Sequence, residues 1–191
     1  MSNQSPSIID CLTGSFLIST QKMPDPRFEE QVILICAHSE EGAMGVAINK
    51  PNSMFTLQEI LKSSELPVPE GMLPPVHVGG PVELESAFIL YSTGYTTEYQ
   101  LEVSSTVFLS REIKVLEDIA NGNGPDKYLF LLGYAGWGPG QLERELLEDG
   151  WLTVPASDAI IFDTEDDEKW RAAAMQYGID ISVYGDVAGR A

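Results

Sequence analysis

The stretch from Tyr128 to Trp151 constrains the fold of this chain most, because it joins an apolar run to an amphipathic segment through closely spaced glycines. Residues 128–132 read Tyr-Leu-Phe-Leu-Leu, which is typical of a strand buried on both faces. Four glycines lie between positions 133 and 140, and we expect them to end this strand. A helix should then begin near Pro139–Gly140, and a second strand at Trp151.

The predicted helix is amphipathic. Leu142, Leu146 and Leu147 fall on one stripe at helical spacing, whereas Glu145 falls mostly off it. We therefore expect the leucines to face the core and the acidic side chains to face water.

A glycine-rich bend between a strand and a helix can bind a phosphate, because amide groups point outward at the start of a helix. The spacing fails here, since Gln141 stands where a dinucleotide-binding loop needs its third glycine and no Lys-Ser/Thr pair follows. We interpret the bend as a structural turn around Trp137 and predict no cofactor.

Trp137 lies between two glycines, so its indole has no neighbouring side chains to cover it. It either fills the core or forms the floor of a pocket. We favour the core, because aromatic side chains more often pack inside than serve as ligand platforms.

The segment Gly133-Tyr-Ala-Gly-Trp-Gly-Pro-Gly-Gln-Leu-Glu-Arg-Glu resembles the signature of the AlgH/YqgE-like family of bacterial proteins. Three other segments resemble further family blocks: Gly14-Ser-Phe-Leu-Ile-Ser with Asp25-Pro-Arg-Phe, Glu41 to Pro51, and Val78-Gly-Gly-Pro-Val82. The resemblance implies a mixed-sheet α+β fold. The family is largely uncharacterised, a role as transcriptional regulator has been attached to some members, and the resemblance supplies no catalytic residues.

The net charge of −18 argues against the function classes that depend on a basic surface. Duplex DNA and anionic membranes carry negative charge, and the few Lys and Arg residues are scattered singly. The first seven residues lack the basic cluster and apolar core expected of a signal peptide, and no apolar run is long enough to span a membrane, so we expect a soluble, cytoplasmic protein.

Cysteine usage fits that compartment, since Cys11 and Cys36 are the only two and are expected to be free thiols. Cys36 and His38 lie two residues apart in a predicted strand, and so should share one face. No second Cys/His pair at ligand spacing accompanies them, and His77 is the only other histidine, so we predict no metal.

The rest of the chain alternates strands with a few short helices. Asp25 and Thr56 are predicted helix caps, the latter in a capping box with Glu59. We also predict strands over 99–109 and 159–162, and a solvated helix start at 165–168. Residues 1–11 should form a frayed tail, and residues 12–191 a single α+β domain with a mixed, mostly antiparallel sheet and about three to four short helices.

Five side chains are candidates for binding a ligand or partner, because they lie at the glycine bend or at strand ends: Trp137, Gln141, Glu143, His38 and Asn49. No nucleophile–base motif accompanies them. We therefore favour a non-catalytic binding or regulatory module acting through a protein or small-molecule partner. The alternatives are an enzyme with a small-molecule substrate at the Trp137 bend and, less favoured, a direct DNA-binding regulator.

The charge argument predicts that the protein does not bind duplex DNA tightly at physiological salt. A gel-shift titration against genomic fragments tests this. Sub-micromolar binding that weakens steeply with added salt would contradict the prediction, because such a slope reports the release of counterions by a basic surface.

Overall fold

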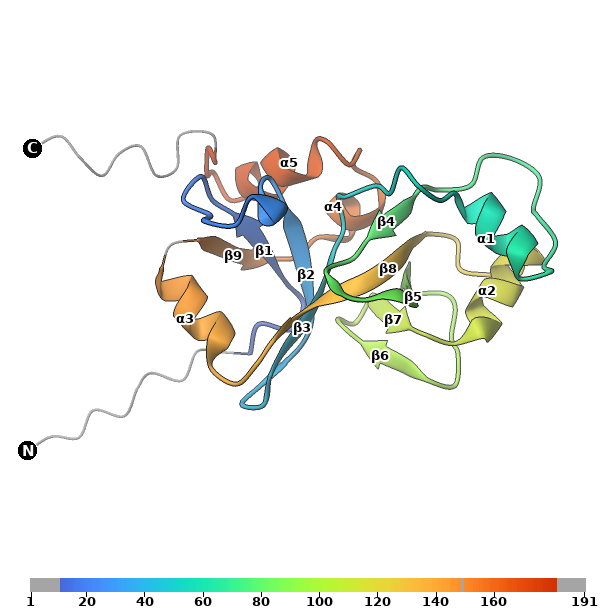
Figure 1. Ribbon diagram of the computed structural model, residues 1–191, viewed down its shortest axis with the longest axis horizontal. Helices are drawn as coiled ribbons and strands as arrows, with labels where there is room; N and C mark the ends of the chain where they lie inside the picture. Colours follow the sequence, from blue (N-terminus) through green and yellow to red (C-terminus); the bar gives the residue numbers. More distant parts are fainter. Residues whose placement is uncertain (1–10, 149, 182–191) are drawn as a thin grey trace, which may run out of the picture.

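A computed structural model describes residues 11–148 and 150–181 (Figure 1). The predicted N-terminal tail lies outside these residues except for Cys11. The described chain contains, in order, β1 (Ser15–Ser19), η1 (Pro26–Phe28), β2 (Val32–Ser39), β3 (Gly42–Ala47), α1 (Leu57–Ser63), β4 (Val76–Val78), β5 (Val82–Ser92), β6 (Gln100–Glu102), β7 (Val107–Ser110), α2 (Ile113–Ala120), β8 (Tyr128–Trp137), α3 (Gln141–Leu147), β9 (Trp151–Pro155), α4 (Asp158–Phe162) and α5 (Lys169–Met175).

The strands form one nine-stranded sheet in the order β6-β7-β5-β8-β3-β2-β1-β9, with β4 added beside β8. The β4–β8 pair is parallel, and the other named pairs are antiparallel. The predicted single α+β domain with a mixed, mostly antiparallel sheet is therefore confirmed. No helix among the described residues is long and apolar enough to cross a membrane.

Strand β8 is longer than predicted, because the glycines bend it without ending it. Its first half pairs with β4 and β5, whereas Ala135, Gly136 and Trp137 pair with β3. Between the two halves Gly133 has φ +72°, and a Cβ there would lie 2.6 Å from the carbonyl oxygen of Gly80. Glycine thus lets two backbones meet where the strand changes partners.

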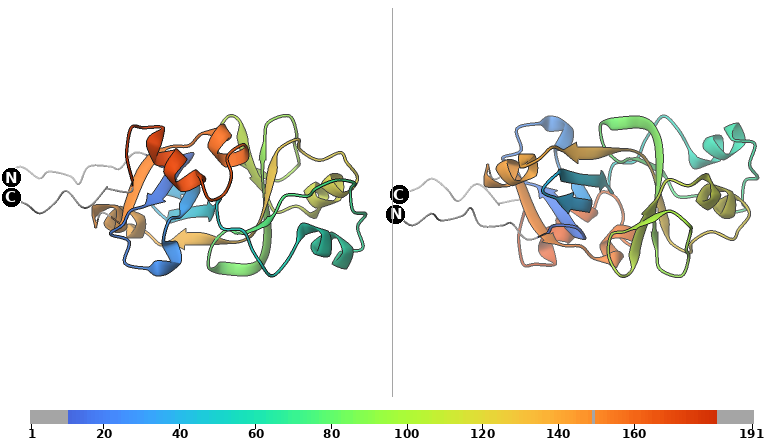
Figure 2. Two further views of the ribbon diagram at one scale, coloured as in Figure 1. Left: turned by 90° about the horizontal axis from the view of Figure 1, so that it is seen from above. Right: turned by 90° about the horizontal axis from the view of Figure 1, so that it is seen from below.

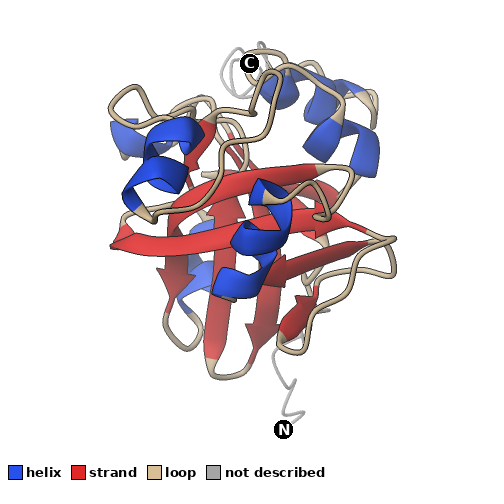
Figure 3. Cartoon of the chain, turned by 90° about the vertical axis from the view of Figure 1, so that its right-hand side faces the viewer, coloured by secondary structure: helices blue, strands red, loops and turns tan. Residues whose placement is uncertain are grey.

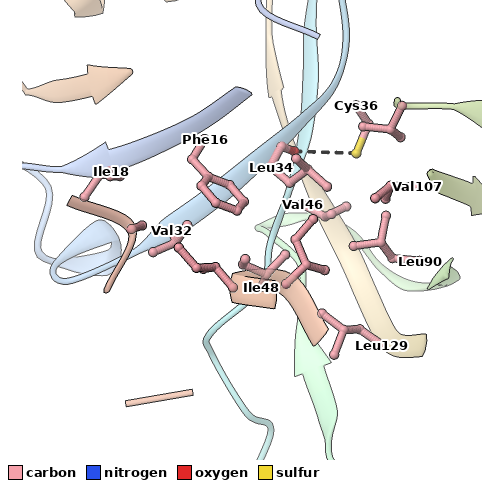
Figure 4. Packing of buried hydrophobic residues seen from close by; sticks show 14 of the residues in the cluster. Phe16, Ile18, Val32, Leu34, Cys36, Val46, Ile48, Leu90, Val107 and Leu129 are labelled. Atoms are coloured by element: carbon pink, nitrogen blue, oxygen red, sulfur yellow. Dashed lines mark hydrogen bonds between the residues drawn. The ribbon is translucent and has the colours of Figure 1, made fainter. Parts of the chain in front are cut away.

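The core has three clusters of buried side chains. The largest lies between the sheet and helices α4 and α5. Figure 4 shows some of the residues that the strands contribute to it, among them Phe16, Leu34, Val46 and Leu90. The views in Figure 2 place α5 over the strands β1 and β2, which it contacts.

The second cluster lies under helices α1 and α2, and the third lies under helix α3. The second contains buried residues of α1 and α2, and lies on the side of the molecule that is turned toward the viewer in Figure 3. The third contains Leu142 of α3 with Trp137 and Trp151 from the adjoining strands.

The predicted helix starts at Thr56 and Asp25 are confirmed. The Thr56 hydroxyl accepts from the Glu59 amide, and the Glu59 carboxylate accepts from the Thr56 amide. Asp25 caps a short 3-10 helix in which Pro26 is the first residue. Both features are local, so the sequence specifies them without help from the rest of the fold.

Two predicted strands were wrong. Residues 159–162 belong to helix α4, which buries Ile160 and Ile161; an apolar run this short does not distinguish a helix from a strand. Residues 99–109 form the β6–β7 hairpin, because the Ser104 hydroxyl accepts from the amides of Thr106 and Val107 and turns the chain.

The acidic segment before α5 is also not a simple solvated helix start, because Asp166 joins a buried polar link. Its carboxylate accepts from His77 Nε2 at 2.9 Å and from Lys169 Nζ at 2.8 Å. Lys169 is 2% exposed and also donates to the Ile48 carbonyl at 2.8 Å. The link ties α5 to β4 and to the end of β3.

The balance of interactions lowers the pKa of Asp166. Burial acts to raise this pKa, but the hydrogen bonds from His77 and Lys169 outweigh that effect. The ionised carboxylate therefore stabilises the fold above its ordinary pKa, and the stabilisation is lost as pH falls through the lowered value.

Removing the buried cation should destabilise the protein strongly. We expect Lys169→Met to lower the free energy of unfolding by about 3–5 kcal/mol, because Asp166 and the Ile48 carbonyl lose a buried partner. Urea unfolding with unchanged slope measures the loss.

The matched control is Lys127→Met, which breaks an ion pair with Asp163 whose side chains are 51% and 50% exposed. We expect that change to cost less than about 1 kcal/mol. Equal losses for the two variants would show that the buried link carries no special stability.

Candidate functional site

An open groove lies where β8 passes from one half of the sheet to the other. Its volume is about 810 Å³, and it is lined by the β2–β3 hairpin, β5, β6, β7 and the second half of β8. Its apolar wall includes Met44, Val82, Phe88, Leu101 and Leu109. A groove of this size and composition can bind a small organic molecule.

Aromatic side chains and one cation line the groove together. Phe88 packs edge-on against Tyr134, with the ring centroids 5.8 Å apart. The Arg111 guanidinium lies over the ring of Phe88, 4.9 Å from its centroid. Its Nη2 donates to Glu83 Oε2 at 3.2 Å and to the Ser86 hydroxyl at 3.1 Å.

Glu83 reaches Arg111 because β5 bulges at this point. The pairing of β5 with β8 shifts between Val82 and Ala87, and Glu83 has φ +49°. A non-glycine residue seldom adopts this conformation. The irregular segment therefore holds a carboxylate beside the groove's cation.

Two of the predicted site residues, His38 and Glu143, form a pair. The Leu12 amide donates to His38 Nδ1 at 3.0 Å, so Nε2 carries the proton and donates to Glu143 Oε1 at 2.8 Å. This hydrogen bond lowers the pKa of Glu143. Both ring nitrogens are thus used in holding the start of the described chain and α3 against β2.

Trp137 and Gln141, two further predicted residues, meet at a carboxylate that the sequence analysis placed toward water. Glu145 accepts from the indoles of Trp137 at 2.9 Å and Trp151 at 3.1 Å, and from Gln141 Nε2 at 3.0 Å. Gln141 in turn accepts from the Gly138 amide.

The side of α3 that packs against the sheet therefore differs from the predicted leucine stripe. Glu145 lies on the same side as Leu142 and Leu146, whereas Leu147 is 82% exposed. A signal for Glu145 was present in the sequence: it stands four residues after Gln141 and between two tryptophans, whose indoles need acceptors when buried.

Trp137 packs in the core. It is 7% exposed and belongs to the cluster under α3, on the opposite face of β8 from the groove-lining Tyr134. Trp137 is also among the residues that line the groove, but its indole packs in the cluster with Leu142 and Trp151.

Asn49 lies apart from the other predicted residues. Its side chain accepts from the Val32 amide at 2.9 Å and donates to the Glu30 carbonyl at 2.9 Å. These bonds hold Glu30 in its positive-φ turn before β2, which gives Asn49 a structural role.

Cys36 and His38 do not share a face as predicted, because a bulge between Ile35 and Ala37 shifts the register of β2. Cys36 enters the largest core cluster, and burial raises its pKa to about 12. Cys36 and the exposed Cys11 are both free thiols. Within the described residues no three His, Cys, Asp or Glu side chains are grouped to hold a metal.

The packing of Trp137 predicts that Trp137→Ala lowers the free energy of unfolding by about 3–5 kcal/mol, through a cavity between β8 and α3. The control is Leu147→Ala on the same helix, expected to change it by less than about 0.5 kcal/mol because the side chain is exposed. Urea unfolding at equal slope compares them. A Trp137→Ala loss under about 1.5 kcal/mol would overturn the core assignment.

Comparisons with known proteins agree with this architecture. The profile of the AlgH-like family matches residues 16–182. UPF0301 protein DP2218 of Desulfotalea psychrophila is 43% identical over 94% of this chain and 95% of its own length. UPF0301 protein SPO0296 of Ruegeria pomeroyi is 44% identical, covering 94% of this chain and 99% of its own.

Solved structures show the same fold. The solution structure of AlgH from Pseudomonas aeruginosa superposes with a TM-score of 0.75 at 38% identity, covering 100% of both chains. The crystal structure of DIP2367 from Corynebacterium diphtheriae shares the fold, with a TM-score of 0.73 at 18% identity over 96% of this chain and 94% of that one. The chain belongs to the AlgH-like family.

Proposed function

We propose that this protein is a non-catalytic binding module and that the groove beside β8 is its binding site. The observation that carries the proposal is the groove itself: a hollow of about 810 Å³ with apolar walls, at the junction of the two halves of the sheet. Concave apolar sites with a few polar groups are typical of ligand binding.

The polar side chains around the groove favour binding over catalysis. His38 uses both ring nitrogens in hydrogen bonds, so it offers no free base. The Ser110 hydroxyl donates to the Tyr99 carbonyl, and the Ser39 hydroxyl accepts from the Glu41 amide. A nucleophile needs an adjacent base with a free position, and no groove-lining side chain in the described part of the chain has that arrangement.

The buried position of Trp137 weighs against the alternative of an enzyme site at the glycine bend. The indole nitrogen is bound by Glu145 and Trp137 is only 7% exposed, so little of the ring is open to a substrate. The groove, whose lining Trp137 joins only at the end of β8, is therefore the better candidate.

Methionine methyl groups provide a direct test, because Met44 lines the groove and Met72 does not. Met72 is 99% exposed and lies beside a separate hollow of about 430 Å³ near α1. We expect hits from a small-molecule fragment library to shift the methyl NMR signal of Met44 and to leave those of Met72 and Met175 in place.

A variant of a groove-lining residue tests whether the fragments bind in the groove. Ala37→Trp places an indole on the groove wall and should weaken the same fragments about tenfold or more. Met72→Leu is the control and should leave binding unchanged. Shifts spread equally over the exposed methionines, or fragment binding that survives Ala37→Trp, would count against the groove as the site.

A further inference from the structure

The proposed function leaves the chemical class of the groove's ligand open, and Arg111 supplies evidence on it. Arg111 is the one Lys or Arg among the described residues that line the groove. The chain as a whole has 29 acidic and 11 basic side chains, so a cation placed on an apolar wall is a local exception. Its chemistry indicates what the groove can select.

The guanidinium retains unused hydrogen-bonding capacity. Only its Nη2 donates to described residues, to Glu83 and Ser86, which leaves Nε and Nη1 without partners in that part of the chain. Arginine has five N–H donors arranged to bind a carboxylate with two parallel bonds. Arg111 can therefore accept another anion.

The contact with Glu83 can be exchanged. Its N–O distance of 3.2 Å is long for a charge-assisted hydrogen bond, and the two side chains are 58% and 47% exposed. Such a pair contributes little to stability. Glu83 therefore competes weakly for the cation when the groove is empty.

The surroundings of Arg111 favour a ligand with an apolar body. The guanidinium lies over Phe88, which packs against Tyr134, so apolar and aromatic surface begins directly beside the charge. The Tyr134 hydroxyl makes no hydrogen bond to any described residue and is a second polar group for the ligand. An anion without an apolar body would use only the edge of this wall.

Resting on the proposed function, we infer that the groove binds a free small organic anion whose apolar body carries one carboxylate or sulfonate group. The apolar body lies along Met44, Phe88 and Leu109, and the anionic group pairs with Arg111 in place of Glu83. The guanidinium disfavours an apolar cation at the same position.

Two fluorescent probes distinguish binding to the apolar wall of the groove from binding to the charge of Arg111. 1-Anilinonaphthalene-8-sulfonate carries the anionic group, and N-phenyl-1-naphthylamine has the same aromatic body without it. For the sulfonate probe we expect Arg111→Gln to raise the Kd about tenfold or more and Glu83→Gln to lower it several-fold. The neutral probe should bind both variants as it binds the wild type.

Matched controls remove general charge effects. Arg144→Gln makes the same change of charge on α3, and Glu65→Gln does so at another exposed glutamate with positive φ; neither residue lines the groove. Both should leave the sulfonate probe unaffected. Circular dichroism of each variant verifies that the fold is kept, since this probe also binds loosened cores.

The outcomes distinguish the inferred ligand class from the proposal that the groove is the binding site. If Ala37→Trp abolishes binding of both probes but Arg111→Gln leaves the sulfonate probe unchanged, the inferred ligand class is wrong and the groove remains the binding site. If Ala37→Trp affects neither probe, or if neither probe binds the wild type, the groove is not the site and the proposed function fails with it. A tighter sulfonate probe in Glu83→Gln together with a weaker one in Arg111→Gln supports the inference.

Discussion

The fold depends on one strand that serves both halves of the sheet. β8 pairs with β4 and β5 in its first half and with β3 in its second, so every other strand is placed relative to it. The change of partner requires the backbones at Gly80 and Gly133 to touch, which no side chain at position 133 would permit. The groove is a direct result, because it lies where the two halves diverge beside this strand.

The polar groups near β8 divide into two kinds. Around α3, the indoles of Trp137 and Trp151 and the imidazole of His38 all have partners, and each of these bonds joins α3 to a strand. Such a saturated network stabilises one arrangement and leaves nothing for a ligand. In the groove, by contrast, Arg111 has donors to spare beside apolar surface.

The sequence predicted those parts of the structure that neighbouring residues determine. The capping box at Thr56, the β2–β3 hairpin and the helix after Gly140 depend on short-range patterns, and each is present. The family resemblance supplied the fold class. The leucine stripe alone did not show that Glu145 turns inward, because its acceptor role depends on two indoles from different strands.

The same limit applies to the candidate site. His38 and Glu143 were predicted as separate candidates, yet their pairing joins residues 105 apart in the chain. The bulge that separates Cys36 from His38 arises from pairing with β3. The Arg111–Glu83 contact requires the irregular segment of β5, which only the sheet as a whole defines.

The position of β1 has a consequence for how the chain reaches this structure. β1 pairs with β2 on one side and with β9 on the other, and the second pairing joins Ser15 to Pro155. A strand made early on the ribosome thus keeps one open edge until nearly the whole described chain has been synthesised. Pairings between such distant segments are slow to form, and an open strand edge is where chains associate wrongly. The period before β9 arrives is therefore the time when the unpaired edge of β1 is most open to wrong association.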